Sequence, residues 1–516
     1  MEYVRLRSPA ESGQTLVMPP LASASERVEQ NHIAGQWADA SLAPIREIAR
    51  QELAGLALKY TRQYADVSDP VNSDRIVFSG HQPRLFHPGV WFKNFALSQI
   101  AKNSNSVSIN LVVDNDLCNT ASIALPRFSA EGKVGLSHVF FDDPGQEIPF
   151  EARTILNREL FAAFGQEVAE RISPIVSDPI VKALWPQVMQ ASVGFTDRIG
   201  AAIAAGRHRL ELQNGIQNLE LPVSVMAGSV SFANFFALVV QRSTEFSAAY
   251  NESLAEYRIL NRIRSRSHPV PELELRDRWQ ELPFWCWHRE TPRRRRLFVK
   301  HEGGARYQAT DHEGWTAEFE LPSGSSVSLD EVFGDVLIRP RALATTMFVR
   351  MFACDLFLHG IGGAKYDQLT DQIAKSFWGD PPPPFMTVTA TQRLPFGIEA
   401  VTREQIVGLQ REIREIEFHP ERFASGEGSV RLRDEKADLL KSIPSEGSRK
   451  EWHDRMVAVN RQFADLLAQE SSELQSKLKS AKDQLAAGRI IASREFPFAL
   501  FPAGLVDELR GSLQLS

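Results

Sequence analysis

A glycine cluster flanked by charged side chains is the feature of this sequence best suited to chemistry. Three glycines separate a histidine from a lysine, a tyrosine and an aspartate, in the order His359, Gly360, Gly362, Gly363, Lys365, Tyr366 and Asp367. The residues after the glycines have the pattern of the first turns of a helix. Amide groups at a helix N-terminus can hold an anion, and a lysine adds positive charge. The cluster therefore predicts an anion-binding loop, or else only a tight connection before a helix.

Two further groups of polar residues follow predicted strands in the first part of the chain. These strands are the apolar runs 75–78 and 108–113, with a helix predicted between them over 90–102. Such a unit makes the strands parallel and places ligands at their carboxyl ends. We therefore expect both groups to face one crevice: Gly80, His81 and Gln82 after the first strand, and Asp114, Asn115 and Asp116 after the second.

The rest of the predicted α/β core comes from the second half of the chain. Strands are predicted at 336–340 and 385–389, and a helix over 342–357 leads into the glycine cluster. The region 151–335 is predicted to be an insertion, with helices over 151–172 and 180–205 and a small antiparallel patch near 315–321. Its basic run 293–296 either reaches a phosphate or carboxylate or forms a solvated hairpin tip.

The C-terminal part has a different, helical pattern. Aliphatic residues recur at three- and four-residue spacing from Ile406 to Ile416 and again from Met456 to Leu485. This predicts an antiparallel coiled-coil hairpin joined by residues 419–450, with a structural or dimer-forming role. The predicted organisation is an N-terminal segment over 1–75 with a helix at 41–64, core halves at 76–150 and 336–400, the insertion at 151–335, the coiled coil at 401–490 and a docking tail at 491–516.

Composition bounds the class of protein. The 516 residues are 43% hydrophobic and carry a formal net charge of −6, without the basic excess of a nucleic-acid binder. No apolar segment approaches the ~20 residues that span a bilayer. Three scattered cysteines, Cys118, Cys286 and Cys354, fit a reducing compartment. We expect a cytoplasmic protein whose partner is a small molecule, with no nucleic acid and no membrane.

Several common catalytic motifs are missing from the sequence. It contains neither the phosphate-loop motif nor the spaced-glycine dinucleotide fingerprint. His-Glu-x-x-His, Gly-x-Ser-x-Gly and paired Cys-x-x-Cys motifs are also missing. Simple readings as a metalloprotease, an α/β-hydrolase or a zinc ribbon are therefore excluded.

Three segments, in order along the chain, carry a family resemblance. Residues 78–86, followed by Pro88-Gly89 and Lys93, are similar to a Gly-Gln-Gln-Pro-Gly-Leu-Phe segment with its following Gly-Pro and Lys. Residues 112–116 resemble an acidic Glu-Asp-His-Asp strand end. Arg339-Pro340 resembles an Arg-Pro segment. Residues 360–369 resemble the segment Gly-Gly-Pro-Gly-Glu-Ile-Ala-Tyr-Trp-Ala-Gln-Leu. The chain thus resembles, as a distant relative, the cysteine-adding ligases of bacillithiol biosynthesis.

The resemblance implies a Rossmann-like, nucleotidyltransferase-like core with inserted segments and a coiled coil that supports a homodimer. It also implies a ligase that joins a cysteine-like amino acid or small acid to the amine of an amino-sugar acceptor. The chain departs from the family pattern at His81, Arg84 and Lys365. Lys365 replaces a glutamate and so reverses the local charge, which indicates a different substrate.

Roles for the polar residues follow from a reaction that activates a carboxylate. If ATP or ADP with Mg²⁺ takes part, the phosphates need amides and cations, and the metal needs carboxylate oxygens, for which Asp114 and Asp116 are available. The sequence alone leaves the cofactor unknown. Candidate catalytic residues are His81, Asp114, Asp116 and His359; candidate cofactor-binding residues are Gly80, Gln82, Lys93, Gly360, Gly362, Gly363 and Lys365; candidate substrate-binding residues are Asn115, Arg339, Tyr366 and Asp367.

Structural readings of the same residues stay open. Asp114 to Asp116 also fit a strand-to-loop turn, and Lys93 also fits a helix lysine that extends to solvent. Two other functions are consistent with the sequence: a non-catalytic scaffold that keeps the fold, and a transferase that acts on another small-molecule precursor.

Overall fold

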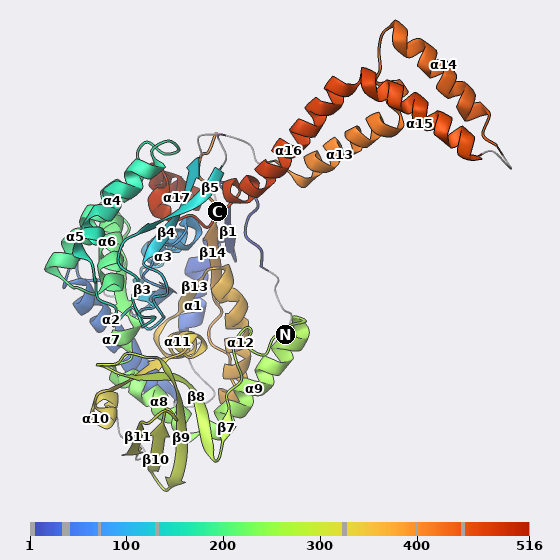
Figure 1. Ribbon diagram of the computed structural model, residues 1–516. Helices are drawn as coiled ribbons and strands as arrows, with labels where there is room; N and C mark the ends of the chain where they lie inside the picture. Colours follow the sequence, from blue (N-terminus) through green and yellow to red (C-terminus); the bar gives the residue numbers. More distant parts are fainter. Residues whose placement is uncertain are drawn as a thin grey trace. The chain divides into compact units, whose positions relative to one another are not determined.

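The described part of the chain folds into two compact units. The computed structural model describes residues 6–33, 42–70, 74–128, 134–321, 328–397, 401–444 and 449–514. Its core unit comprises Met1–Leu125, His138–Leu394 and Arg494–Ser516, and its helical unit comprises Pro126–Ser137 and Pro395–Ser493 (Figure 1). Each unit is described below by itself.

A mainly parallel sheet lies at the centre of the core unit. Among the described residues its strand order is β1-β14-β13-β2-β3-β6, and all neighbours are parallel except the β1–β14 pair. Phe78 of β2 lies opposite Phe357 of β13 and Ile109 of β3, and all three are buried. Burial on both faces explains why these strands are continuous apolar runs. The strands are β1 Thr15–Met18, β2 Ile76–His81, β3 Val107–Val112, β6 Leu219–Pro222, β13 Leu356–His359 and β14 Met386–Ala390.

Helices of the core unit lie beside this sheet and beside the antiparallel sheet described below (Figure 1). In α2, the buried residues Ile45, Ala49, Leu53 and Ala57 recur at helical spacing and form one apolar stripe. The helices are α1 Ala24–Ile33, α2 Ala43–Thr61, α3 Pro88–Asn103, α4 Arg158–Ile172, α5 Val181–Gly194, α6 Ile199–Gln213, α7 Val223–Met226, α8 Val230–Gln241, α9 Ser243–Leu260, α10 Leu329–Phe333, α11 Ala342–Phe348, α12 Ile361–Trp378 and α17 Leu505–Gln514, with short 3-10 turns at Leu21–Ser23 and Phe498–Leu500.

A second, antiparallel sheet completes the core unit. Its order is β11-β10-β9-β8-β12, with β7 paired to β8. Phe235 of α8 and Phe348 of α11 pack 5.4 Å apart, between ring centroids, in the same apolar core. The antiparallel patch expected near 315–321 is part of this sheet. Its strands are β7 Leu275–Arg276, β8 Trp279–His288, β9 Arg295–Gly303, β10 Arg306–Thr310, β11 Thr316–Glu320 and β12 Val336–Pro340, and a separate ribbon is formed by β4 Ser122–Phe128 and β5 Val134–Phe140.

Two assignments from the sequence need correction. The strand at 336–340 exists, but it pairs antiparallel with β8, so it does not belong to the parallel sheet. The helix predicted over 342–357 ends at Phe348, continues as a π-helical segment Val349–Ala353, and is followed by β13. A continuous apolar run is compatible with a buried helix or a buried strand, and only the neighbouring backbones decide between them. The parallel sheet also takes β6 from within the expected insertion.

The helical unit contains α13 Arg403–Phe418, α14 Glu427–Lys441, α15 Arg449–Leu466 and α16 Ala468–Ile491, with a 3-10 turn at Pro420–Arg422. Figure 1 shows α13 beside α16 and α14 beside α15. Buried Ile416, Leu432, Val459 and Phe463 belong to one apolar cluster. The segment expected to join two helices, 419–450, thus contains a helix of its own. No helix among the described residues is long and apolar enough to cross a membrane.

Candidate functional site

A cavity of about 570 Å³ opens where the carboxyl ends of β2 and β13 meet. From β2 the chain continues through α3 to β3 on one side, whereas β13 leads through α12 to β14 on the other. Ligands of open α/β sheets bind at such a change of direction. The lining residues with chemical capacity are Gly80, His81, Gln82, His87, Lys93, Thr346, His359, Gly360, Gly362, Gly363, Tyr366, Asp367, Thr389, Arg494 and Glu495.

The N-terminus of α12 opens into this cavity. Gly360 precedes the helix, and no side chain caps it. The first amide groups of a helix have no partner within the helix, and they carry the positive end of its dipole. Gly360, Ile361, Gly362 and Gly363 all line the cavity, so an anion could reach these amides. The glycine cluster is therefore the start of a helix at a cavity, as the sequence predicted.

His359 is oriented by a buried carboxylate. Its Nε2 lies 2.7 Å from Oδ2 of Asp367, which also accepts from Nη1 of Arg350. Burial lowers the pKa of His359, so its imidazole is neutral at pH 7. Burial alone would oppose ionisation of Asp367, but the Arg350 guanidinium and His359 hold the pKa of this carboxyl below its usual range. With Nε2–H donated to Asp367, Nδ1 is left with its lone pair.

Gly363 keeps Nδ1 of His359 uncovered. A Cβ at position 363 would lie 2.7 Å from this nitrogen, whereas a Cβ at Gly362 would meet nothing within 4 Å. Both glycines line the cavity, but only at position 363 would a side chain collide with His359. The residue type at 363 therefore matters for the geometry of His359.

Lys93 links the two halves of the site. It is buried on α3, and its Nζ donates to the Gly80 carbonyl at 2.5 Å. Its Cδ lies 4.0 Å from the point that a Cβ would occupy if residue 360 were not glycine. Burial lowers the pKa of Lys93 to about 7. Of the two readings of this lysine, the structure supports a cavity residue and not one that extends to solvent.

Both ring nitrogens of His81 lie beside oxygen atoms of the protein. Nε2 lies 3.1 Å from Oδ1 of Asn94, and Nδ1 lies 3.3 Å from the Gln82 carbonyl. Burial, together with the positive charges of Arg207 and Lys93, lowers the pKa of His81 well below its usual value. A neutral imidazole carries a single N–H, so His81 donates to only one of these two oxygens. His81 thus lines the cavity with its one proton directed at the protein, which suits positioning more than proton donation to a phosphate.

A buried charge network supports this side of the site. Asn94 Nδ2 and Trp91 Nε1 both donate to Oε1 of Glu211, at 2.8 Å and 2.7 Å. Arg207 joins Glu211 to Glu220 through 2.7 Å hydrogen bonds. All these groups are buried and mutually satisfied, so they fix α3 and α6 and have no capacity left for a ligand.

The polar group after β3 is occupied by the protein itself. Asp114 accepts from the amide and hydroxyl of Ser224, and Asn115 donates to the Pro340 carbonyl at 2.7 Å. Arg339 forms a two-armed ion pair with Glu151, with contacts of 2.9 Å and 2.8 Å. Asp114 and Asn115 do not line the cavity that Gly80, His81 and Gln82 line, which corrects the expectation that both groups face one crevice. Arg339, predicted to bind substrate, does not line it either.

Asp116 and Lys365 lie outside the cavity lining as well. Asp116 accepts from Gln82 Nε2 and from Arg294 Nη1, each at 3.2 Å. The basic run 293–296 thus supplies an internal ion pair through Arg294. Lys365 lies on α12, and its carbonyl accepts from the Tyr257 hydroxyl at 3.1 Å. Lys365, expected to bind the cofactor, is therefore not among the residues that line the cavity.

The described residues of the site do not form a preformed metal site. The described residues contain no group of three or more His, Cys, Asp or Glu side chains that could hold a metal ion. Asp114 and Asp116, the expected Mg²⁺ ligands, are engaged by Ser224 and by Gln82 and Arg294. Burial, reinforced by the charge of Glu151, raises the pKa of Asp114 to about 7, which further disfavours a divalent-ion ligand.

Sequence reasoning missed the cavity wall formed by His87, Thr389 and Arg494. Arg494 Nη2 donates to the Thr389 hydroxyl at 3.0 Å. The tail was expected to dock on the core, and Phe498 does stack on Trp91 with centroids 4.3 Å apart. No pattern near position 494 indicated a site, because the helical unit separates it in sequence from the rest of the cavity.

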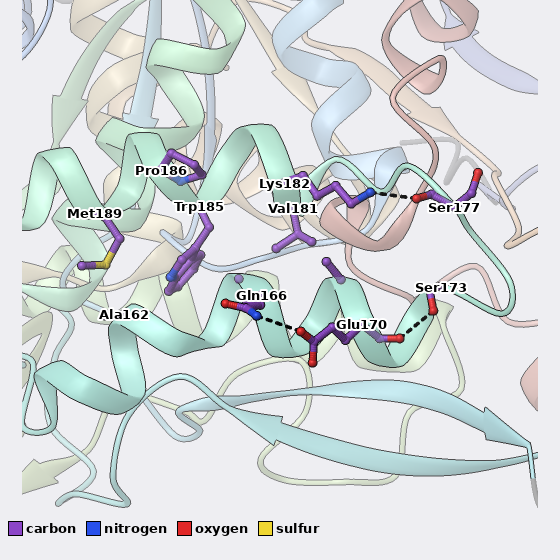
Figure 2. Close-up of a pocket in the computed structure, with 12 residues that line it drawn as sticks. Ala162, Gln166, Glu170, Ser173, Ser177, Val181, Lys182, Trp185, Pro186 and Met189 are labelled. Atoms are coloured by element: carbon purple, nitrogen blue, oxygen red, sulfur yellow. Dashed lines mark hydrogen bonds between the residues drawn. The ribbon is translucent and has the colours of Figure 1, made fainter.

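A second depression, of about 600 Å³, lies between α4 and α5 (Figure 2). Its polar side chains are bonded locally: Gln166 to Glu170, Ser173 to the Glu170 carbonyl, and Lys182 to the Ser177 carbonyl, each at 2.8 Å. The remaining lining is mostly apolar, including Val181, Trp185 and Met189. It is a groove with no reactive group directed into it.

Comparison with known proteins gives no further guide to the site. The sequence matches no protein-family model and no curated protein.

Proposed function

We propose that this chain is an enzyme that joins a small carboxylic acid, such as a cysteine-like amino acid, to the amine of an amino-sugar type acceptor. The observation that carries the proposal is the α12 N-terminus, which opens with Lys93 and His359 into one cavity at the carboxyl ends of β2 and β13. The reaction class is the one that the family resemblance implies. An amide-forming ligase needs an anion site and a base at the same place, and this cavity offers groups for both.

The proposal takes the sheet as Rossmann-like. Its parallel strands run β6-β3-β2-β13-β14, and β2, the first of these five in the chain, lies at the centre. This is the 3-2-1-4-5 part of a doubly wound sheet, in which ligands bind at the point where the order reverses. The same proposal takes the helical unit as a coiled coil through which two copies of the chain form a dimer. Light scattering on the full chain tests this dimer. A molar mass of one chain at every protein concentration would contradict it.

In this scheme the α12 amides would hold phosphate oxygens of ATP or ADP, and Lys93 would supply the neighbouring positive charge. Bound nucleotide would supply the phosphate that activates the carboxylate. His359, neutral and oriented by Asp367, would accept a proton from the acceptor amine at Nδ1. Gly363 leaves room for the amine beside that nitrogen.

Calorimetric titration of the full chain with ADP and Mg²⁺ tests the nucleotide half of the proposal. We expect binding that Lys93→Met weakens by about tenfold, the loss of one charge-assisted contact. Lys102→Met, an exposed lysine on the same helix, is the matched control and should bind as the unchanged protein does. Folded protein that does not bind ADP contradicts the nucleotide assignment and favours the non-catalytic scaffold.

A further inference from the structure

Arg494 places a cation on the cavity wall without a buried counter-charge. Its Nη1 and Nη2 donate to the hydroxyls of Thr391 and Thr389, at 3.2 Å and 3.0 Å. Both hydroxyls donate in turn to main-chain carbonyls, those of Pro9 and Gly89. The acceptors that fix the guanidinium are therefore neutral, and its Nε is buried without a hydrogen-bond partner.

The more deeply buried arginines Arg207 and Arg350 of the core unit are, by contrast, neutralised. Arg207 meets Glu211 and Glu220, Arg350 meets Asp367, and each of these carboxylates is at most 2% exposed. Arg494 forms an ion pair with Glu495, whose side chain is 70% exposed. A guanidinium with 17% of its side chain exposed normally requires compensation, since an unpaired charge is costly away from water. Beyond this exposed partner, the positive charge of Arg494 can therefore be compensated only from the cavity that this residue lines, by solvent or by a bound anion.

The guanidinium is held in place by close packing. A Cβ at Gly89 would lie 2.5 Å from Nη2 of Arg494 and 2.8 Å from the Thr389 hydroxyl. A Cβ there would come closer still to the Ala390 carbonyl, so only glycine at position 89 allows α3 to begin this close to β14 and to Arg494. A group fixed this tightly loses little conformational entropy when it binds a ligand.

Glu495 shows what kind of group suits this wall. Its Oε1 lies 3.6 Å from Nε of Arg494, and its Oε2 lies 3.6 Å from Nε2 of His87. Both separations are too long for hydrogen bonds. The Glu495 carboxylate thus pairs electrostatically with both groups, at distances too long for direct hydrogen bonds to these two atoms.

We propose that Arg494, assisted by His87, binds a carboxylate of the molecule that occupies this cavity, and that Glu495 competes with it. A planar carboxylate matches the fork of a guanidinium in a two-armed contact. The inference deepens the proposed function, on which its catalytic meaning rests: one reactant carries a carboxylate that does not react and serves as an anchor. Arg494 is then a specificity-determining residue contributed by the C-terminal tail.

Calorimetric titration of the full chain with succinate, and with succinamide as its uncharged counterpart, tests this subsite. We expect millimolar-range binding of succinate alone, weakened about tenfold or more by Arg494→Gln and less by Arg494→Lys. Arg510→Gln, an exposed arginine of the same tail, is the control and should leave binding unchanged. Circular dichroism of each variant verifies folding.

The variant Glu495→Gln keeps the test decisive if Arg494→Gln does not fold. It removes the competing carboxylate and should tighten succinate binding several-fold. Equal binding of succinate and succinamide, no binding by the unchanged protein, or no response to Glu495→Gln overturns the proposal. The ADP titration is separate: succinate binding through Arg494 in a chain that does not bind ADP leaves the subsite standing and removes the nucleotide assignment.

Discussion

The carboxyl ends of β2 and β13 and the carboxyl end of β3 are equally polar in sequence, yet they differ in what their side chains can do. At β2 and β13, the α12 amides, His359 and Lys93 face a cavity. At β3, Asp114 and Asn115 are tied to Ser224 and to the Pro340 carbonyl. Polar residues at a strand end indicate a ligand site only where the fold leaves their donors and acceptors unused.

Glycine decides which of the two ends is open. Gly360, Gly362 and Gly363 bring main chain to the cavity surface without side chains to cover it. The β3 end has no such glycines: Asp114, Asn115 and Asp116 follow one another, and the Glu151 amide donates to the Asp114 carbonyl at 2.8 Å. The open end thus presents main-chain donors, whereas the closed end uses its side chains to join β3 to β12 and α7.

The largest expected effect tests whether the β3 end is purely structural. Glu151→Ala removes the partner of buried Arg339 and should lower the free energy of unfolding by about 3–5 kcal/mol, because an unpaired charge remains buried. Denaturant titration measures the loss, with Glu147→Ala, an exposed glutamate nearby, as the control. Folded Glu151→Ala protein should keep its ADP affinity. A selective loss of ADP binding at unchanged stability would place this end in the site and break the comparison.

A smaller effect is expected at the open end from a single methyl group. Gly363→Ala places a Cβ 2.7 Å from Nδ1 of His359 and should cost about 1–3 kcal/mol of unfolding free energy through overpacking. Gly362→Ala meets nothing and should be neutral or stabilise the helix by up to about 1 kcal/mol. Thermal or urea unfolding of the pair measures the contrast. Equal stability of the two variants would show that His359 is free to move away.

The smallest effect concerns the charge of Lys93. Burial favours its neutral form, with a pKa of about 7, so the folded protein holds this proton only at lower pH. Anion binding that needs the proton should weaken about tenfold between roughly pH 6 and pH 8. The measurement is the ratio of ADP dissociation constants of Lys93→Met and unchanged protein, which cancels the titration of ADP itself. A ratio that does not fall as pH rises would remove Lys93 from the anion site.

Much of the secondary structure could be predicted, but strand partners could not. The runs that became β2, β3 and β14 were recognised as strands, and α3 was recognised as a helix. The short strand β6, Leu219–Pro222, was missed because four residues ending in proline carry almost no periodic signal. The run 336–340 was recognised as a strand but placed in the wrong sheet, since its partner β8 lies some fifty residues earlier and nothing in either pattern names the other.

The candidate site was predictable to the same extent. His359, the glycines, Lys93 and Asp367 were named from the sequence and line one cavity, whereas Asp114, Asn115 and Arg339 were named and do not. Arg494 was not named, because its role depends on Gly89 and Thr389 from distant parts of the chain. Residue type and local order thus indicate which groups have chemical capacity. They do not indicate which of these donors and acceptors will be bonded to another part of the protein after folding.

The sequence by itself determined the apolar runs that form buried strands, the helix that begins after Gly360 and the polar character of each strand end. Those properties follow from local periodicity and from the missing Cβ of glycine, which act over a few residues. Only the tertiary structure decided that β13 lies beside β2, that Ser224 closes the β3 end and that Arg494 returns to the cavity. These outcomes depend on which distant groups satisfy one another's hydrogen bonds and charges, and that is fixed only when the chain packs.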